Sequence, residues 1–317
     1  MTHDEERALA QVAHEAIKEL RARRRWKIFF RFLFVGLFAA YVLYIVNATR
    51  QKEPAQANAQ HVAVVQVHGE IGAQDYANAA DVIESLEDAF AHPQALAVFL
   101  DINSPGGSPV QSAQVYRAIN RLKEKHKKPI YAVISDVGAS GAYYIAAAAD
   151  EIHADAASLV GSIGVISQSY GVGDLLGKIG VEARTFTSGE SKDFLNMAKP
   201  LREEDVAHMN AMLDNVHQQF IRAVKEGRKD ALKYEEHPEV FSGLFWSGEQ
   251  ALELGLIDGL ADMRELALAK AGTAVLRVYE PHLSPWETLR RNLASESGAA
   301  LRQFLGVHQK VDAVLAK

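Results

Sequence analysis

The sequence of 317 residues contains no cysteine. This absence excludes disulfide bonds, thiolate metal sites and a cysteine nucleophile, and it is compatible with any redox compartment. The 12 histidines are scattered, and none of them forms an HExxH motif or another spacing typical of metal ligands. The net charge of −6 gives no reason to expect a nucleic acid as partner. The sequence therefore predicts no metal, no cofactor and no nucleic-acid partner.

One long apolar run lies near the N-terminus. Residues 1–27 are highly charged and end in a basic cluster, and residues 28–46 are apolar except for Arg31. A membrane-spanning helix needs roughly 20 apolar residues, so this run is just long enough, and Arg31 lies close enough to its start to reach the interface. Because basic residues precede the run and few follow it, we expect a transmembrane helix with a cytoplasmic N-terminus and with the downstream chain outside.

A cleaved signal peptide is the alternative to this anchor. Ala57-Asn58-Ala59 offers a cleavage site of the A-x-A type. However, the charged segment before the apolar run is long, and this site lies well beyond the end of the run. The geometry of signal peptides therefore favours an uncleaved anchor, followed by a linker over residues 47–60.

Strand-like and helix-like patterns alternate from His61 onward. Apolar runs at 62–67, 96–102 and 130–135 are typical of buried strands, and amphipathic patterns predict helices at 80–91, 110–122 and 203–227. Residues 151–168 and 181–187 also read as strands, the first broken by glycines. This alternation predicts an α/β domain over residues 61–282, with a parallel sheet packed on both faces. Residues 283–317 are expected to form a C-terminal helical tail.

A cluster of small residues joins one predicted strand to the next helix. Gly138-Ala139-Ser140-Gly141 follows the run 130–135 and precedes an alanine-rich segment that favours a helix. Small residues are needed where the backbone reverses tightly. Ser140 is therefore expected at a helix N-terminus, where free N–H groups suit a nucleophile and the Gly141 amide can hold an oxyanion. The alternative is that Ser140 only caps the helix.

A serine nucleophile needs a base, usually histidine or lysine. His153 is the next histidine after Ser140 but lies inside a predicted strand, where a structural role is expected. His68 ends the first strand and is a weaker candidate. Lys192 follows the predicted strand 181–187 on a loop that could face the same sheet edge. A lysine acts as a base near neutral pH only where burial or neighbouring charge favours its neutral form, and spacing alone does not distinguish Lys192 from a surface lysine.

Several motifs in register resemble the signal peptide peptidase A (protease IV) family of bacterial membrane-bound Ser–Lys proteases. In chain order they are Ser104-Pro-Gly-Gly-Ser108, Gly138-Ala-Ser-Gly-Ala-Tyr-Tyr144, Gly161-Ser-Ile-Gly-Val165, Ser188-Gly-Glu-Ser-Lys192 and Ala251-Leu-Glu-Leu-Gly-Leu-Ile-Asp258. The resemblance covers about residues 60–270. A set of motifs in one order is far more specific than any single motif.

The resemblance implies a fold and a chemistry. The fold would be a Rossmann-like wound sheet of the Clp protease and crotonase type, and the activity that of a serine endopeptidase that needs no cofactor. Ser140 would be the nucleophile and Lys192 the general base, with oxyanion N–H groups from Gly106, Gly107 and Gly141. The substrates would be cleaved signal peptides and similar apolar peptides.

The resemblance also implies a location and an assembly. The chain would be a single-pass protein of the bacterial inner membrane, with its catalytic domain in the periplasm or otherwise outside the cytoplasm. One copy of the domain indicates the short form of the family, in which homo-oligomeric rings build the active sites. In such rings the Ser and Lys of one site can come from adjacent subunits.

Two other functions are compatible with parts of the sequence. A crotonase-like acyl-CoA enzyme would share the Gly-Gly turn and the wound sheet, but the predicted anchor places the domain where CoA is scarce. A non-catalytic scaffold in membrane protein quality control would carry Ser140 and Lys192 as vestiges. Hydrolysis of an apolar peptide that depends on Ser140 separates the protease from both.

Overall fold

The computed structural model describes residues 18, 24–41, 43 and 59–282, and the chain divides into two compact units, Met1–Ala59 and Gln60–Lys317. In the first unit residues 24–41 are helical and exposed. Over the described residues, no helix is both long and apolar enough to cross a membrane. The predicted span 28–46 is described only in part. The predicted tail 283–317, most of residues 1–27 and most of the linker 47–60 lie outside the described residues.

The second unit is organised around an 8-stranded sheet with the order β6-β5-β3-β2-β1-β8, in which β4 pairs with β3 and β7. Every strand pair is parallel except β5 with β6. The strands are β1 (His61–His68), β2 (Ala95–Ser104), β3 (Ile130–Ala139), β4 (Glu151–Ala154), β5 (Leu159–Gly161), β6 (Phe245–Ser247), β7 (Gly259–Leu260) and β8 (Leu276–Tyr279). The prediction of an α/β fold with a mainly parallel sheet is confirmed.

Several helices of this unit begin after a residue whose side chain caps them. The helices are α2 (Ala79–Ala91), α3 (Pro109–His126), α4 (Gly141–Ala146), α5 (Gly173–Lys178), α6 (Glu203–Arg228), α7 (Gly248–Glu253) and α8 (Met263–Ala271). For example, the Ser108 hydroxyl accepts a hydrogen bond from the Gln111 N–H at 3.4 Å, and Pro109 occupies the first turn of α3. The long helix predicted at 203–227 is α6, one residue longer than expected.

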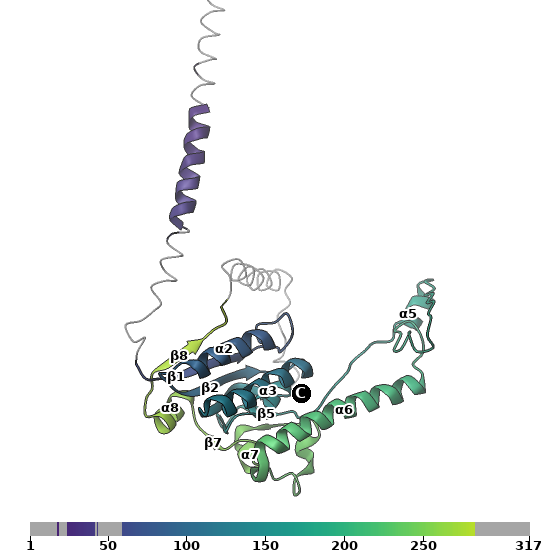
Figure 1. Cartoon of the computed structure of the whole chain (residues 1–317). Coiled ribbons are helices and arrows are strands. Elements are labelled where there is room, and N and C mark those ends of the chain that lie inside the picture. The colour runs from purple at the N-terminus through teal and green to yellow at the C-terminus, as the bar shows by residue number, and fades with distance from the viewer. Residues whose placement is uncertain (1–17, 19–23, 42, 44–58, 283–317) are drawn as a thin grey trace, which may run out of the picture. The chain divides into compact units, whose positions relative to one another are not determined.

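Helices cover the two faces of the sheet unequally. On one face α2, α3, α4 and α6 pack on the larger apolar core, and Figure 1 shows α2 and α3 lying over the strands. On the other face α8 covers a smaller cluster that includes Val64, Phe99 and Val133. Side chains alternate along a strand, so the same face continues at Gln66 and Ser135, which are exposed. The expectation of a sheet packed on both faces therefore holds for only part of the second face.

The pairing of β2 with β3 brings two glycine-rich turns together. Ser104, the last residue of β2, lies beside Gly138 of β3. The turn that follows Ser104 and the turn at Ser140 therefore leave the sheet at the same carboxyl edge. This is the edge at which wound α/β sheets bind their ligands, as the sequence led us to expect.

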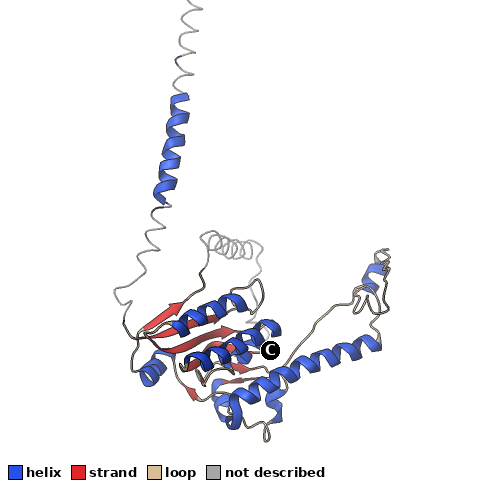
Figure 2. Cartoon of the chain, in the orientation of Figure 1, coloured by secondary structure: helices blue, strands red, loops and turns tan. Residues whose placement is uncertain are grey.

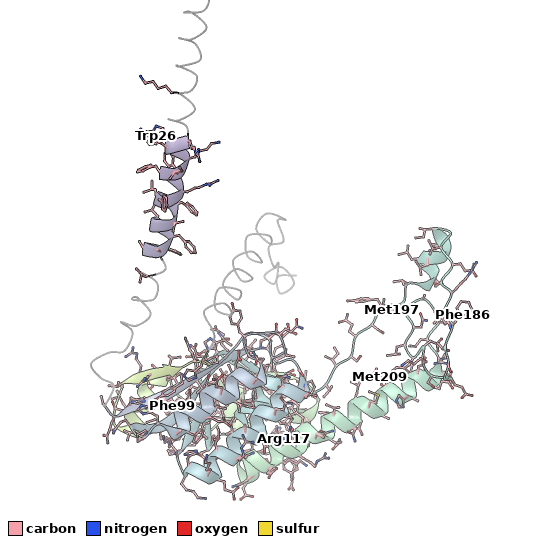
Figure 3. The ribbon with its side chains drawn as sticks, turned by 45° about the horizontal axis from the view of Figure 1, so that its top comes forward. Trp26, Phe99, Arg117, Phe186, Met197 and Met209 are labelled. Carbon is pink, nitrogen blue, oxygen red and sulfur yellow. The ribbon has the colours of Figure 1, made fainter. Side chains whose placement is uncertain are left out.

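Residues 166–202, called here the arm, lie outside the sheet. Figures 1 and 3 show the arm, with α5, Phe186 and Met197, at the far end of α6 from the strands, and Figure 2 shows that it is mostly loop. The prediction of a strand at 181–187 is wrong, because this segment pairs with none of the strands that the structure describes. Residues 162–168 are likewise not a strand, since pairing ends at Gly161.

Candidate active site

Ser140 occupies a strained position between β3 and α4. Its φ of 53° and ψ of −124° lie where residues other than glycine are uncommon. The Ser140 N–H donates to the Gly161 carbonyl at 2.8 Å, and the Ser140 carbonyl accepts from the Tyr144 N–H at 3.0 Å. Its hydroxyl makes no capping hydrogen bond to α4. The backbone hydrogen bonds therefore fix the position of the half-buried Ser140, and its hydroxyl stays available to react with a substrate. The missing capping bond does not fit the alternative in which Ser140 only caps the helix.

The Ser140 turn packs directly against the Gly106-Gly107 turn. A Cβ added to Gly106 would lie 2.7 Å from both the Ser140 Cβ and the Gly141 nitrogen. Gly106 has a φ of 99°, and Gly107 a φ of 148°. Only glycine allows this backbone path and this approach together. The nitrogen of Gly107 in turn lies 3.3 Å from the position that a Cβ on Gly141 would take.

Two backbone amides at this junction are available to an oxyanion. The Gly107 and Gly141 N–H groups donate to no acceptor among the described residues. The Gly106 N–H, by contrast, donates to the hydroxyl of the fully buried Ser104 at 3.1 Å. Gly106 therefore contributes close packing, while Gly107 and Gly141 hold the two amides at this junction that have no acceptor among the described residues.

Buried hydrogen bonds support the short helix that begins after Ser140. The Tyr143 hydroxyl is fully buried and donates to the Leu256 carbonyl at 2.6 Å, and burial raises the pKa of Tyr143. The Ser112 hydroxyl donates to the Ser108 carbonyl at 3.0 Å and packs where a Cβ on Gly141 would stand. Sequence reasoning missed Ser112 because a lone serine on a predicted helix carries no signal of its own.

A small hollow opens beside Ser140. Its lining combines residues of the two turns with residues of α3, α4, α6 and the segment after β5: Gly107, Pro109, Ala113, Ser140, Gly141, Tyr144, Gly164, Val165, Val216, Gln219 and Phe220. The hollow has a volume of about 30 Å³. Phe220 and Val216 come from α6, which contains none of the sequence motifs, so the sequence did not place them here.

The structure does not bring Lys192 to Ser140 within this chain. Lys192 is exposed in a turn of the arm, where its N–H donates to the Gly189 carbonyl at 3.2 Å. It is absent from the lining of the hollow beside Ser140. The structure therefore gathers Ser140, Gly141, Gly106 and Gly107, and leaves the predicted base apart from them.

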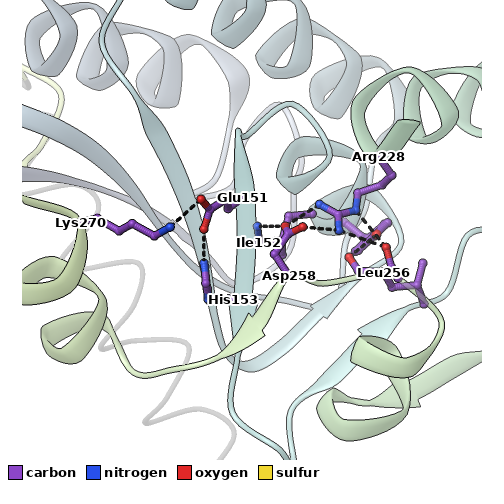
Figure 4. A network of polar contacts seen from close by, with 9 residues as sticks. Glu151, Ile152, His153, Arg228, Leu256, Asp258 and Lys270 are labelled. Atoms are coloured by element: carbon purple, nitrogen blue, oxygen red, sulfur yellow. Dashed lines mark hydrogen bonds and ion pairs between the residues drawn. The ribbon is translucent and has the colours of Figure 1, made fainter. Parts of the chain in front are cut away.

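His153 lies inside β4, as expected, and is held by a structural network. Figure 4 shows the Glu151 carboxylate between Lys270 and His153, at 2.6 Å from the Lys270 Nζ and 2.9 Å from the His153 Nε2. Burial opposes the charged form of Glu151, but its hydrogen bonds with Lys270 and His153 bring its pKa below the usual value. The His153 side chain is buried and does not line the hollow beside Ser140.

His68 is committed to a different carboxylate. Its Nε2 lies 3.0 Å from Asp101 Oδ2, and the hydrogen bond to Asp101 raises the pKa of His68. The same carboxylate accepts a weaker hydrogen bond from the Ser135 hydroxyl at 3.4 Å. Neither histidine is placed to take a proton from Ser140 in this chain.

A buried ion pair fastens the end of α6 beneath α4. Arg228, with 3% of its side chain exposed, donates from Nη1 to Asp258 Oδ2 at 2.6 Å and from Nη2 to Oδ1 at 2.9 Å. Asp258 also accepts from the Ile152 N–H at 2.7 Å (Figure 4). Partial burial opposes the charged form of Asp258, but these hydrogen bonds together hold its pKa below the usual value.

Known proteins resemble this chain both in sequence and in structure. Residues 122–276 match the family model described as "Peptidase family S49". The chain is 35% identical over 164 residues to a putative signal peptide peptidase SppA of Enterococcus faecium, a match that covers 51% of this chain and 46% of that protein. It is 45% identical over 226 residues to a protein of Brucella abortus (strain 2308) named Na(+)/H(+) antiporter NhaA, covering 69% of this chain and 30% of the other.

The match with solved structures is more remote. The 1510-N membrane-bound stomatin-specific protease, in complex with a substrate peptide, is similar with a TM-score of 0.46 and 18% identity, over 75% of this chain and 99% of that one. Of the two curated relatives named in the preceding paragraph, the chain spans less than half the length. The match to peptidase family S49 over residues 122–276 and the similarity to a putative signal peptide peptidase SppA agree with the resemblance to the signal peptide peptidase A family that the motifs predicted.

Proposed function

We propose that this chain is a serine endopeptidase that cleaves signal peptides released from precursors and similar apolar peptides. The observation that carries the proposal is the junction of Ser140 with the Gly107 and Gly141 amides. The Ser140 hydroxyl makes no capping bond, and the two amides have no acceptor among the described residues. A nucleophile beside preorganised donors is the arrangement that acyl transfer needs.

In this proposal Ser140 attacks a peptide carbonyl and its proton passes to Lys192. The attacked oxygen becomes an oxyanion held by the Gly107 and Gly141 amides. Lys192 then gives the proton to the leaving amine, and a water molecule hydrolyses the acyl-enzyme by the same route. A single oxyanion donor of this kind is worth about 3–4 kcal/mol in comparable sites.

We propose further that Lys192 serves the Ser140 of an adjacent subunit in a homo-oligomeric ring. Two observations support this assembly. Lys192 stands apart from Ser140 in its own chain. The arm that carries it exposes large apolar side chains, among them Ile166 at 84% and Phe186 at 92% exposure, more than an isolated subunit ordinarily leaves to water. Desolvation between subunits would favour the neutral amine that a lysine base requires.

The first unit supports a membrane anchor in this proposal. The described helix over residues 24–41 exposes apolar side chains along its length, including Phe32 at 74% and Phe34 at 73%. Arg24, Arg25 and Lys27 precede this apolar stretch. By the distribution of basic residues, the N-terminus would lie in the cytoplasm and the peptidase domain outside the inner membrane.

One experiment tests the activity. The purified full chain is incubated with an apolar peptide, and products are followed by mass spectrometry for the wild type, Ser140→Ala and Ser135→Ala. Ser135 lies on β3, the strand that precedes Ser140, and is exposed, so its variant controls for the loss of a hydroxyl. Hydrolysis that survives in Ser135→Ala and disappears in Ser140→Ala supports the proposal. Undiminished hydrolysis in Ser140→Ala would refute Ser140 as the nucleophile, and no hydrolysis in the wild type would refute the peptidase and favour the scaffold.

A further inference from the structure

The hollow beside Ser140 is lined in part by residues of the proposed active site and in part by residues of other elements, which form its floor. Ser140, Gly141 and Gly107 form one wall of the hollow. In the proposed reaction the attacked carbonyl carbon lies at the Ser140 hydroxyl, with its oxygen at the two glycine amides. The Cβ of the substrate residue that carries this carbonyl is only two bonds from the attacked carbon. It must therefore find space within a few ångströms of these same three residues.

The floor of the hollow is a rigid aromatic stack. Phe220 of α6 stacks on Tyr144 of α4, with ring centroids 4.8 Å apart and 24° between the planes. Tyr144 meets Tyr116 edge-on at 5.4 Å, and the Tyr116 hydroxyl donates to the Ala223 carbonyl at 3.2 Å. Phe220 is only 4% exposed. Because each ring is held by the next, the floor cannot recede to admit a larger group.

The segment after β5, which also lines the hollow, is held against α6. The His217 Nε2 donates to the Ile163 carbonyl at 2.9 Å, which ties the segment after β5 to α6. Next along this segment, a Cβ on Gly164 would lie 2.9 Å from the Cα of Gly243. Val165, which lines the hollow, is thereby kept at a fixed distance from α6.

The size and chemistry of the hollow limit what it can receive. No residue of its lining is charged, and most of the side chains are apolar. One water-sized probe occupies about 10–15 Å³ on this measure, so 30 Å³ holds two or three non-hydrogen atoms. Alanine, serine and valine side chains, with one to three non-hydrogen atoms, fit this space, whereas leucine and phenylalanine side chains are larger.

We propose that this hollow receives the side chain on the acyl side of the scissile bond and restricts it to small uncharged residues, with Phe220 and Val216 setting the limit. The inference rests on the proposed peptidase function and adds to it the sequence at which apolar peptides are cut. Phe220 and Val216 act as specificity-determining residues, since they bound the substrate pocket without touching the reacting atoms.

The test uses the full chain and a set of otherwise identical apolar peptides with Ala, Val, Leu or Phe before the scissile bond. For the wild type we expect kcat/KM for Ala to exceed that for Leu by about 10-fold or more, in the range that one or two excess methylenes impose. Val216→Ala and Phe220→Leu should raise kcat/KM for Leu relative to Ala by a similar factor. Val206→Ala is the matched control, because Val206 lies on α6 outside the hollow.

The outcomes separate this inference from the activity on which it rests. If the wild type cuts none of the peptides, the peptidase proposal fails and the pocket assignment fails with it. If cleavage depends on Ser140 but favours Leu or Phe over Ala, the peptidase stands and the size limit is overturned. The limit is also overturned if folded Val216→Ala and Phe220→Leu both keep the wild-type ratio. Using both variants guards against a Phe220 substitution that disturbs the core.

Discussion

Gly106 lies directly behind Ser140, so close that a single added carbon would displace the nucleophile. A Cβ on Gly106 would meet the Ser140 Cβ at 2.7 Å, the Gly141 nitrogen at 2.7 Å and the Ala139 carbonyl oxygen at 2.8 Å. The two glycine-rich turns are thus one packed unit. The position of Ser140 depends on a residue of the preceding strand–helix connection as much as on its own.

Gly106→Ala should therefore damage both folding and activity. The backbone at φ 99° and the contacts with Ser140 together should cost about 2–4 kcal/mol of unfolding free energy, and kcat should fall by about 100-fold or more as Ser140 shifts. Gly69→Ala is the control, since Gly69 has a φ of 78° with no atom within 4 Å of an added Cβ. It should lose about 1 kcal/mol and keep its activity. Equal effects in the two variants would contradict the packing argument.

The dyad predicts a non-additive set of variants. Ser140→Ala and Lys192→Ala should each lower turnover by about 10⁴–10⁶-fold. The double variant should lose little more, because the loss of either residue already abolishes the function of the pair. Steady-state kinetics on purified full chain checks this. A Lys192→Ala variant with near-normal turnover would mean that another group is the base. His68→Ala and His153→Ala should keep most of the activity, since neither side chain is placed at Ser140.

Mixing the two inactive variants tests whether subunits share their sites. If Lys192 of one chain serves Ser140 of the next, mixed oligomers of Ser140→Ala and Lys192→Ala contain some intact sites, and activity reappears after subunit exchange. Sedimentation should show the wild type as a multi-subunit assembly. An inactive mixture that has exchanged subunits, or a fully active monomer, would place both residues of the dyad in one chain.

Loss of Asp258 should destabilise the domain more than loss of an exposed acid. Asp258→Ala leaves the Arg228 guanidinium, 3% exposed, without its carboxylate, at a cost of about 2–4 kcal/mol of unfolding free energy. Glu87→Ala, which breaks the exposed Arg121–Glu87 pair, should cost at most about 1 kcal/mol. Urea unfolding measures both. Similar costs for the two variants would show that the Arg228 pair is not structurally important.

Asp258 also predicts a pH dependence of stability. Its pKa in the folded chain lies below the reference value of 3.8, so the folded state holds the proton less tightly than the unfolded state. The stabilisation is fully present above about pH 4–5 and is lost as the pH falls through the folded pKa. Thermal unfolding from pH 6 to pH 2 should show a smaller acid-induced loss in Asp258→Asn than in the wild type. Parallel curves would contradict this.

Local patterns in the sequence were sufficient for the elements around the site. The apolar runs at 62–67, 96–102 and 130–135 form β1, β2 and β3. They could be predicted because the spacing of apolar residues along a short segment reflects the side-chain period of a strand or a helix. The small residues around Ser140 likewise predicted the strand-to-helix turn, since only such residues permit that backbone path. The parallel order then followed from the alternation of strands and helices.

The tertiary structure alone decided which distant segments meet. Residues 181–187 have a strand-like pattern but pair with no strand in the described part of the chain, and Lys192 follows them into the arm rather than to Ser140. The Gly106 turn packs against Ser140, and Phe220 of α6 closes the hollow beside Ser140. Such contacts join residues far apart in sequence, and whether they form depends on how whole elements pack. The residue pattern of a single segment carries no information on that packing.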